Sequence, residues 1–127
     1  MPGFQQKSSY DFLRGTEITQ IQINKYTVCF VFEAGRDADN YFDITVNTVF
    51  EHYNAADGST SKYDVQGATK DFTEYALLEV PVTGTEIVSD DQLKVTFQNR
   101  DALTLIRRDD GHESMTINTP KGVIVID

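Results

Sequence analysis

The sequence has one cysteine, few basic residues, no long hydrophobic run and no recognisable catalytic motif. A single cysteine, Cys29, excludes an intrachain disulfide, and its position inside the apolar stretch 28–31 predicts a small buried hydrophobe rather than a catalytic thiol. The longest apolar run, residues 28–32, is far too short to cross a bilayer. Without a disulfide framework or a secretory hydrophobic region at the N-terminus, we expect a reducing, cytoplasmic location.

Basic residues are scarce: 11 Lys and Arg stand against 20 Asp and Glu, and the net charge is −9. Such an excess of negative charge makes nucleic acid and anionic membranes poor partners and would steer a cationic partner toward the protein. Arg107 and Arg108 are followed directly by Asp109 and Asp110, which cancels a phosphate-binding patch. We therefore expect neither a nucleic acid nor a membrane partner.

Motifs for metal, phosphate and nucleophilic chemistry are missing. No H-x-x-x-H, C-x-x-C, phosphate-loop or G-x-S-x-G pattern occurs, and residues 37–40 and 57–59 lack the twelve-residue calcium pattern with its closing Glu. His112 beside Glu113 is better explained by a solvated turn than by acid–base chemistry, and His52 by a satisfied, half-buried histidine. We expect no metal, no cofactor and no enzymatic activity.

The residues that are present predict a β-rich globular fold. The chain of 127 residues is long enough for a hydrophobic core and is predicted to be a single domain, residues 1–127. Hydrophobic residues make up 39% of it, and the eight Phe and six Tyr favour sheet over helix.

The tetrapeptide Gly-Thr-Glu-Ile occurs twice, at residues 15–18 and 84–87. Each copy is followed by a turn, an alternating apolar strand, a polar break and a second strand. We therefore predict a mostly β or α+β fold of two related antiparallel units, about residues 13–53 and 82–126, with about eight strands. One short helix, about residues 69–79, would join the units.

In the first unit we expect a helical turn over residues 10–13 and a strand over 17–24, with either a bulge or a late strand start at Ile18. Strands over 26–33 and 41–53 follow, the latter broken near 47–48, with loops at 34–40 and 54–61.

The joining helix is predicted from a helical spacing of Phe72, Tyr75, Ala76 and Glu79, and Pro81 would end it. In the second unit the predicted strands cover 85–89, 92–98, 102–107, 114–117 and 123–126. Aligning the units places Tyr26, Val28 and Phe30 opposite Leu93, Val95 and Phe97, and residues 44–46 opposite 103–105.

Several of these positions resemble a family of small, uncharacterised bacterial β-rich proteins with a duplicated strand pattern. The resemblance rests on Leu13-x-Gly15-x-x-Ile18-x-x-Ile21 in the first half, and in the second half on Leu93-x-Val95-x-Phe97, Leu103-x-Leu105 and Glu113-Ser114-Met115. The family pattern usually has an aromatic residue where this chain has Met115. Small acidic proteins of this kind are similar to immunity proteins of polymorphic or contact-dependent bacterial toxin systems, and the resemblance implies no catalytic residue.

Acidic residues flank most of the predicted loops, and turns at one end of a sheet can converge into one negative surface. Such a surface would cover a basic active site, as in an inhibitor of a nuclease toxin, although Asp is also simply a good turn residue. The candidate partner-binding residues are Glu33, Asp37, Asp39, Asp43, Asp57, Asp64, Asp90, Asp91, Asp109, Asp110 and Glu113.

Three functions follow as hypotheses. The first is an immunity protein, monomeric or homodimeric, that binds a cognate, basic toxin domain. The second is a regulatory module that buries a small ligand between its sheets, suggested by the aromatic residues Tyr26, Phe30, Phe42, Phe50 and Phe97. The third is an enzyme that uses His112 and Glu113, for which neither residue has an evident catalytic partner.

Overall fold

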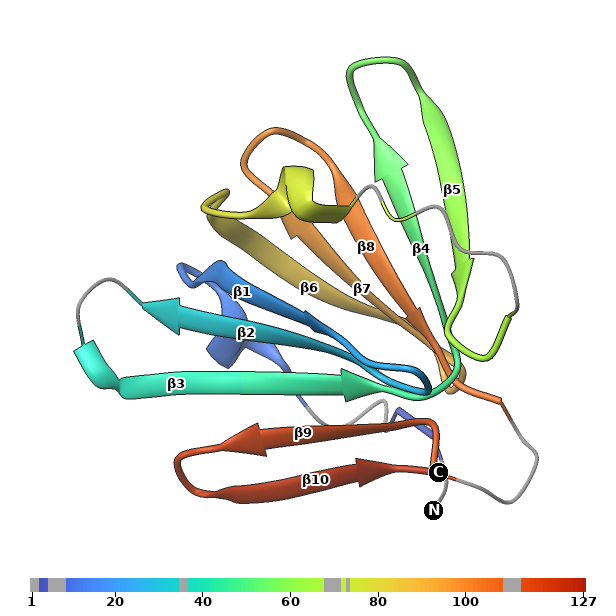
Figure 1. Cartoon of the computed structure of the whole chain (residues 1–127). Coiled ribbons are helices and arrows are strands. Elements are labelled where there is room, and N and C mark those ends of the chain that lie inside the picture. The colour runs from blue at the N-terminus through green and yellow to red at the C-terminus, as the bar shows by residue number, and fades with distance from the viewer. Residues whose placement is uncertain (1–2, 5–8, 35–36, 68–71, 73, 109–112) are drawn as a thin grey trace.

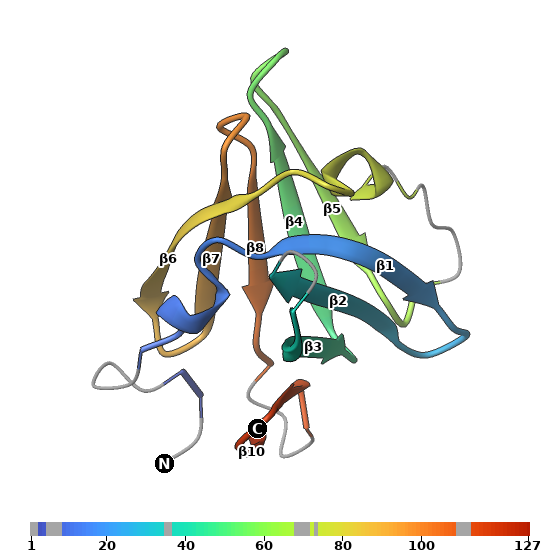
Figure 2. The same ribbon diagram turned by 90° about the vertical axis from the view of Figure 1, so that its left-hand side faces the viewer.

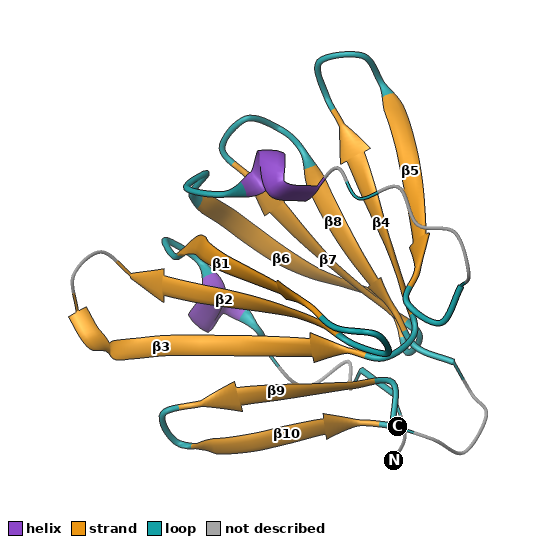
Figure 3. Ribbon diagram, in the orientation of Figure 1, coloured by secondary structure: helices purple, strands orange, loops and turns teal. Residues whose placement is uncertain are grey.

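The computed structural model of the chain describes residues 3–4, 9–34, 37–67, 72, 74–108 and 113–127, and for residues 37–40 it describes the backbone only. Within these residues the protein is mostly β: ten strands form two antiparallel sheets of five strands each, with almost no helix (Figure 3).

Sheet A has the strand order β1-β2-β3-β9-β10, and sheet B has the order β5-β4-β8-β7-β6 (Figure 1). The strands of sheet A are β1 (Glu17–Ile23), β2 (Val28–Ala34), β3 (Asp37–Val46), β9 (Met115–Thr119) and β10 (Gly122–Ile126). Those of sheet B are β4 (Val49–Asn54), β5 (Ser59–Asp64), β6 (Val82–Ser89), β7 (Gln92–Phe97) and β8 (Ala102–Ile106). Two 3-10 helices, η1 (Asp11–Leu13) and η2 (Glu74–Leu77), precede β1 and β6.

Each sheet consists of a three-stranded meander extended by a hairpin from the other half of the chain. The β1-β2-β3 meander pairs with the β9-β10 hairpin, and the β6-β7-β8 meander pairs with the β4-β5 hairpin. The chain passes from sheet A to sheet B at Asn47 and Thr48, where the ends of many strands converge (Figure 1). There the Asn47 N–H donates to the Ser114 carbonyl at 2.8 Å, and the Thr48 hydroxyl donates to the Ile106 carbonyl at 2.6 Å.

The core lies between the two sheets, whose strands cross one another in Figure 2. Strict alternation in the sequence explains which side chains enter it, because every second residue of a strand faces the same side. Phe30 and Phe50, from opposite sheets, meet edge to face with ring centroids 5.2 Å apart. The buried inward-facing residues of the central strands are Val28, Phe30, Phe32, Phe42, Ile44, Val46, Phe50, Leu93, Val95, Phe97, Leu103, Leu105, Met115 and Ile117.

The two halves of the chain repeat backbone details 64 residues apart. The Gly15 N–H donates to the Val82 carbonyl at 2.8 Å, and the Glu79 N–H donates to the Ile18 carbonyl at 2.9 Å. Both donors have positive φ, +85° at Gly15 and +66° at Glu79. A register shift follows in each strand, after Ile18 in β1 and after Val82 in β6. The edges of the two sheets are therefore joined by reciprocal bonds.

The shared Gly-Thr-Glu-Ile tetrapeptide does not mark these equivalent positions. Residues 15–18 lead into β1, whereas residues 84–87 lie inside β6, beyond its first bulge. Val28 pairs with Val46 in sheet A, and Leu93 pairs with Leu105 in sheet B. If residues 44–46 are aligned with 103–105, Val46 matches Leu105, and their partners Val28 and Leu93 match each other. The predicted alignment of Tyr26 with Leu93 is therefore shifted by two residues, the side-chain period of a strand.

Within the predicted helix over 69–79, residues 69–71 and 73 lie outside the described residues. For the residues that the structure does describe, the prediction is wrong. Only η2, a single 3-10 turn, is helical there, and its buried residues are Glu74 and Leu77, whereas Tyr75 is exposed. The turn ends because Glu79 adopts the left-handed conformation and gives its N–H to Ile18. Apolar spacing alone overestimated a helix that the reciprocal bond interrupts.

The remaining strand predictions differ mainly in number. The predicted helical turn over 10–13 and the bulge in β1 are confirmed, and the break near 47–48 separates β3 from β4. The prediction of about eight strands missed that this break puts β4 in another sheet, and it missed β5. The polar residues of β5, with Tyr63 as the one aromatic, hide its pairing with β4.

His52 on β4 is fully buried rather than half-buried, and its partner is Asp101, in the turn between β7 and β8. The His52 Nε2 and Asp101 Oδ2 atoms are 2.9 Å apart, while Asp101 Oδ1 accepts the Ala55 N–H at 2.9 Å. The pair thus ties the β4-β5 and β7-β8 connections of sheet B together.

We expect Gly15→Ala to destabilise the protein by about 1 kcal/mol, because no atom lies near the added Cβ and only the left-handed backbone is penalised. Glu79→Gly should be neutral or stabilising by up to about 1 kcal/mol, since it relieves the equivalent strain. Urea unfolding measures both free energies. Glu86→Gly, inside β6, is the matched control and should destabilise by about 0.5–1 kcal/mol. A Glu79→Gly variant as unstable as that control would contradict this account.

Candidate functional site

The outer face of sheet A presents its side chains in rows that run across the strands. One row is Glu17, Glu33 and Tyr41, which are cross-strand neighbours on β1, β2 and β3. A second row is Gln20, Val31, Asp43, Asn118 and Val123, and a third is Gln22, Cys29, Thr45, Thr116 and Val125. Side chains of alternate residues on one strand lie about 7 Å apart, so a single bound partner could contact two adjacent rows at once.

Acidic groups collect at the β1-β2-β3 side of this face, in what we call the sheet A acidic surface: Glu17, Glu33, Tyr41 and Asp43. Glu17 lies directly opposite Glu33, an arrangement that like charges disfavour. The Asn118 side-chain amide donates to Asp43 Oδ1 at 2.7 Å and fixes that carboxylate. Among the described residues, no Lys or Arg forms an ion pair with these three carboxylates.

Two further titratable groups on this face, the Tyr41 hydroxyl and the Cys29 thiol, have raised pKa values. Partial burial, the charge of Asp43 and a hydrogen bond to Asp43 raise the pKa of Tyr41, with smaller contributions from Cys29 and Glu33. Burial is also the main cause that raises the pKa of Cys29; the hydrogen bond with Thr45 opposes it and the charge of Asp43 adds to it. Cys29 is therefore a poor nucleophile.

The other predicted acidic residues are differently engaged. Asp64 pairs with Arg108 at 3.0 Å, and Asp91 pairs with Arg107 at 2.7 Å. Asp57 accepts bonds from the Ser59 hydroxyl and backbone N–H, which lower the pKa of Asp57. Asp90 is exposed, in the turn between β6 and β7.

Not all predicted site residues are described. The side chains of Asp37 and Asp39, on β3, and all of Asp109, Asp110 and His112 lie outside the described residues. The structure thus brings Glu33 and Asp43 together, while Asp57 lies at the far turn of the β4-β5 hairpin and Asp64 at its other end. Sequence reasoning missed Glu17, Tyr41 and Asn118, because their proximity depends on strand register.

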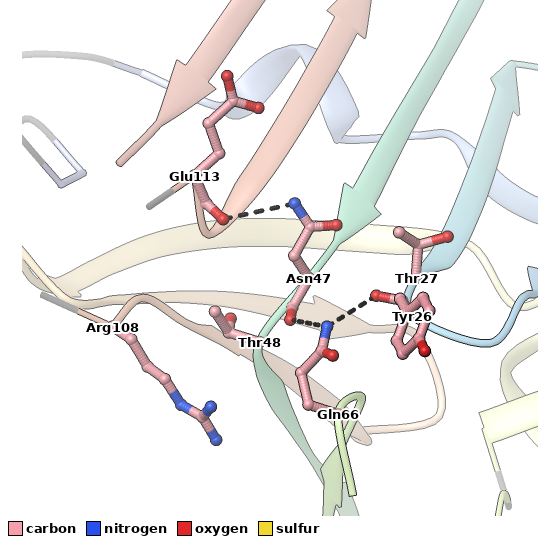
Figure 4. A pocket seen from close by; sticks show the side chains of 7 residues that line it. All are labelled: Tyr26, Thr27, Asn47, Thr48, Gln66, Arg108 and Glu113. Atoms are coloured by element: carbon pink, nitrogen blue, oxygen red, sulfur yellow. Dashed lines mark hydrogen bonds between the residues drawn. The ribbon is translucent and has the colours of Figure 1, made fainter. Parts of the chain in front are cut away.

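A second surface feature is a polar pocket of about 370 Å³ beside the crossing between the sheets (Figure 4). Gln66 organises it: its Nε2 donates to the carbonyls of Tyr26 and Asn47, each at 3.0 Å (Figure 4). The Asn47 amide donates to the Glu113 carbonyl at 3.4 Å. Tyr26 is 58% exposed, and Lys25 lies over its ring at 5.2 Å from the centroid.

The described residues that line the polar pocket are largely engaged in structural hydrogen bonds. Its polar side chains bond to backbone carbonyls, and Arg108 lies at the opposite end from Tyr26, paired with Asp64 (Figure 4). Tyr26, predicted as the first residue of a strand, is instead part of the turn between β1 and β2, because β2 begins at Val28.

A third feature is an apolar pocket of about 440 Å³ between η1, β3 and the β9-β10 hairpin. Phe12 and Phe42 stack in a tilted arrangement on one side, with ring centroids 4.9 Å apart. Its other lining residues are Thr119, Pro120, Lys121 and Ile124. The volume lies in the range of small-molecule sites.

Within the described ranges, no group of three or more His, Cys, Asp or Glu side chains is arranged to hold a metal ion. The part of the chain that the structure describes likewise contains no helix of the length and hydrophobicity needed to cross a membrane. No family model matches the chain, and no curated protein or solved structure shows significant similarity to it.

Replacing Asp43 by Asn should lower the pKa of Tyr41 and also that of Cys29, because it removes a negative charge that disfavours the tyrosinate and the thiolate. Tyrosinate absorbance during a pH titration, read as a difference from Tyr41→Phe, follows the first group. The rate of Cys29 alkylation at fixed pH follows the second and should rise. Asp57→Asn is the control and should change neither; equal behaviour of both variants would contradict the assignment.

Proposed function

We propose that the protein is a non-catalytic, cytoplasmic inhibitor of a basic protein, of the kind represented by immunity proteins of bacterial toxin systems. The observation that carries the proposal is the sheet A acidic surface, where three carboxylates lie together on a broad sheet face. The resemblance noted in the sequence and the net charge of −9 support the same class of partner.

Electrostatics gives the sheet A acidic surface a reason to bind cations. The repulsion between Glu17 and Glu33 costs folding free energy and would be relieved by a basic group placed between them. Tyr41, 42% exposed, adds a rigid aromatic contact of the type that dominates binding energy in interfaces. Strand pairing holds these groups in fixed positions, so binding would require little reordering.

The test is titration with a basic protein domain encoded by a neighbouring gene. We expect a 1:1 complex whose association rate falls roughly tenfold between 50 and 500 mM salt. Glu33→Lys combined with Asp43→Lys should weaken binding by at least about tenfold, since charge reversal adds repulsion to lost attraction. Stopped-flow fluorescence and calorimetry measure the rate and the affinity.

Asp57→Lys combined with Asp64→Lys is the matched control, with the same change of net charge on sheet B. Its effect on affinity should be less than about threefold, because only long-range charge is altered. Equal losses for both pairs would move the contact away from the sheet A acidic surface. Absence of binding at low salt would rule out the inhibitor role.

The apolar pocket favours a second candidate function, the binding of a small apolar ligand. Phe12, Phe42 and Ile124 supply its apolar walls, and the Lys121 ammonium at the rim suits a ligand with a carboxylate head. In this case the protein would be a carrier or a ligand-responsive regulator without catalytic activity.

Decanoate is a suitable probe for the apolar pocket. Binding should raise the melting temperature by several degrees at millimolar ligand, by mass action on the folded state. Lys121→Gln should reduce that shift, whereas Lys94→Gln, on β7 of sheet B, should not. An unchanged melting temperature in the parent protein would remove this candidate.

A further inference from the structure

β10 forms one edge of sheet A and carries an exposed row of alternate residues. Val123 is 61% exposed and Val125 is 45% exposed, while Ile126 of the opposite phase is buried. A charged residue stands two positions beyond each end of this row, Lys121 in the turn before the strand and Asp127 after the strand, and both are exposed. The exposed row therefore reads Lys, Val, Val, Asp at every second position.

The other three sheet edges carry features that hinder pairing with another chain. β1 has a bulge and β6 has two, and the beginnings of β1 and β6 are bridged to each other through Glu17 and Pro81. β5 exposes a polar surface that includes Lys62. β10 pairs with β9 in unbroken register over residues 122–126 and contains neither proline nor charge. Of the four sheet edges, β10 is therefore the one without a feature that hinders pairing with another strand.

The exposed row is complementary to itself. An antiparallel copy of β10 with Ile124 opposite Ile124 puts Val123 against Val125 of the second copy and Lys121 against its Asp127. In this register, odd-numbered residues of one copy lie opposite odd-numbered residues of the other. Their backbone N–H and C=O groups then face each other, as the hydrogen-bond ladder of an antiparallel sheet requires. Centring the pair on Val123 or Val125 instead sets Lys121 against a valine or leaves it without a counterpart.

Charge also favours this edge over the rest of the surface. No acidic residue lies between Glu113 and Asp127, so the β9-β10 hairpin escapes most of the self-repulsion expected at a net charge of −9. The end of β10 is held in place, because Arg107 Nε donates to the Asp127 backbone carbonyl at 3.0 Å. Two cross-strand ion pairs would flank a four-valine contact.

We propose that the occupant of the β10 edge is a second copy of this chain, paired antiparallel about Ile124. Sheet A then continues through both subunits as a ten-stranded sheet. The twofold axis runs perpendicular to the sheet, so both sheet A acidic surfaces face the same side. Five strand spacings separate β3 from its counterpart, about 24 Å. The proposal goes beyond partner inhibition and does not depend on it.

Sedimentation velocity of the full chain at 150 mM salt tests the proposal. The mass should rise from 14.3 kDa toward twice that value, with a dissociation constant on the order of 10–100 µM, since the interface is small. Val123→Lys should shift the dissociation constant at least about tenfold upward by placing like charges in the contact. Val88→Lys, at a valine on β6 that is 50% exposed, should leave the dissociation constant unchanged.

Charge reversal tests the register. Lys121→Asp and Asp127→Lys should each weaken self-association at least about fivefold, because each sets like charges opposite one another. An equimolar mixture of these two variants should associate again, since opposite charges then face each other at both ends, and this recovery shows that both variants are folded. A parent protein that stays at 14.3 kDa at 200 µM, or a mixture that stays monomeric, would overturn the proposal.

Discussion

The structure depends on an exchange of hairpins between its two sheets. Each three-stranded meander has an open edge at its third strand, β3 or β8, and the hairpin that covers this edge comes from the other half of the chain. Neither half can complete a sheet alone, because an unpaired central strand would leave its backbone groups without partners. Folding of the two halves is therefore coupled, and the long sequence separation of these pairings favours slow folding.

Crossing between sheets requires polar groups in a buried place, and the chain supplies them locally. Thr48 and Ser114, the residues just before β4 and β9, are both buried and both hydrogen-bonded through their hydroxyls. Arg107 is also buried, and its guanidinium joins Asp91 to the end of β10. These bonds satisfy polar groups that a purely apolar crossing would leave unpaired. Each buried group without a hydrogen-bond partner would cost about 1–3 kcal/mol of folding free energy.

Alternation along single strands could be predicted from the sequence, whereas contacts between strands could not. The inward faces of β2, β7 and β8 follow directly from the period of two, and the break at Asn47 was visible as a polar interruption. Which sheet β4 joins depends on pairing with β8, more than 45 residues away, which no local pattern encodes. The same limit applied to the site: Glu33 and Asp43 were predicted, but their neighbour Glu17 needs the β1-β2 register.

The two ends of sheet A differ in charge, and this difference decides what each end can bind. At β1, like charges face each other across the strands, so this side would repel a second copy of the chain and, under the proposed function, attract a basic partner. At β10, a lysine and an aspartate terminate an apolar row, so the only charges present are opposite in sign under a twofold operation. Self-association through the β10 edge would place the sheet A acidic surfaces of the two subunits on the same side of one continuous sheet. It would therefore double the acidic surface without covering it.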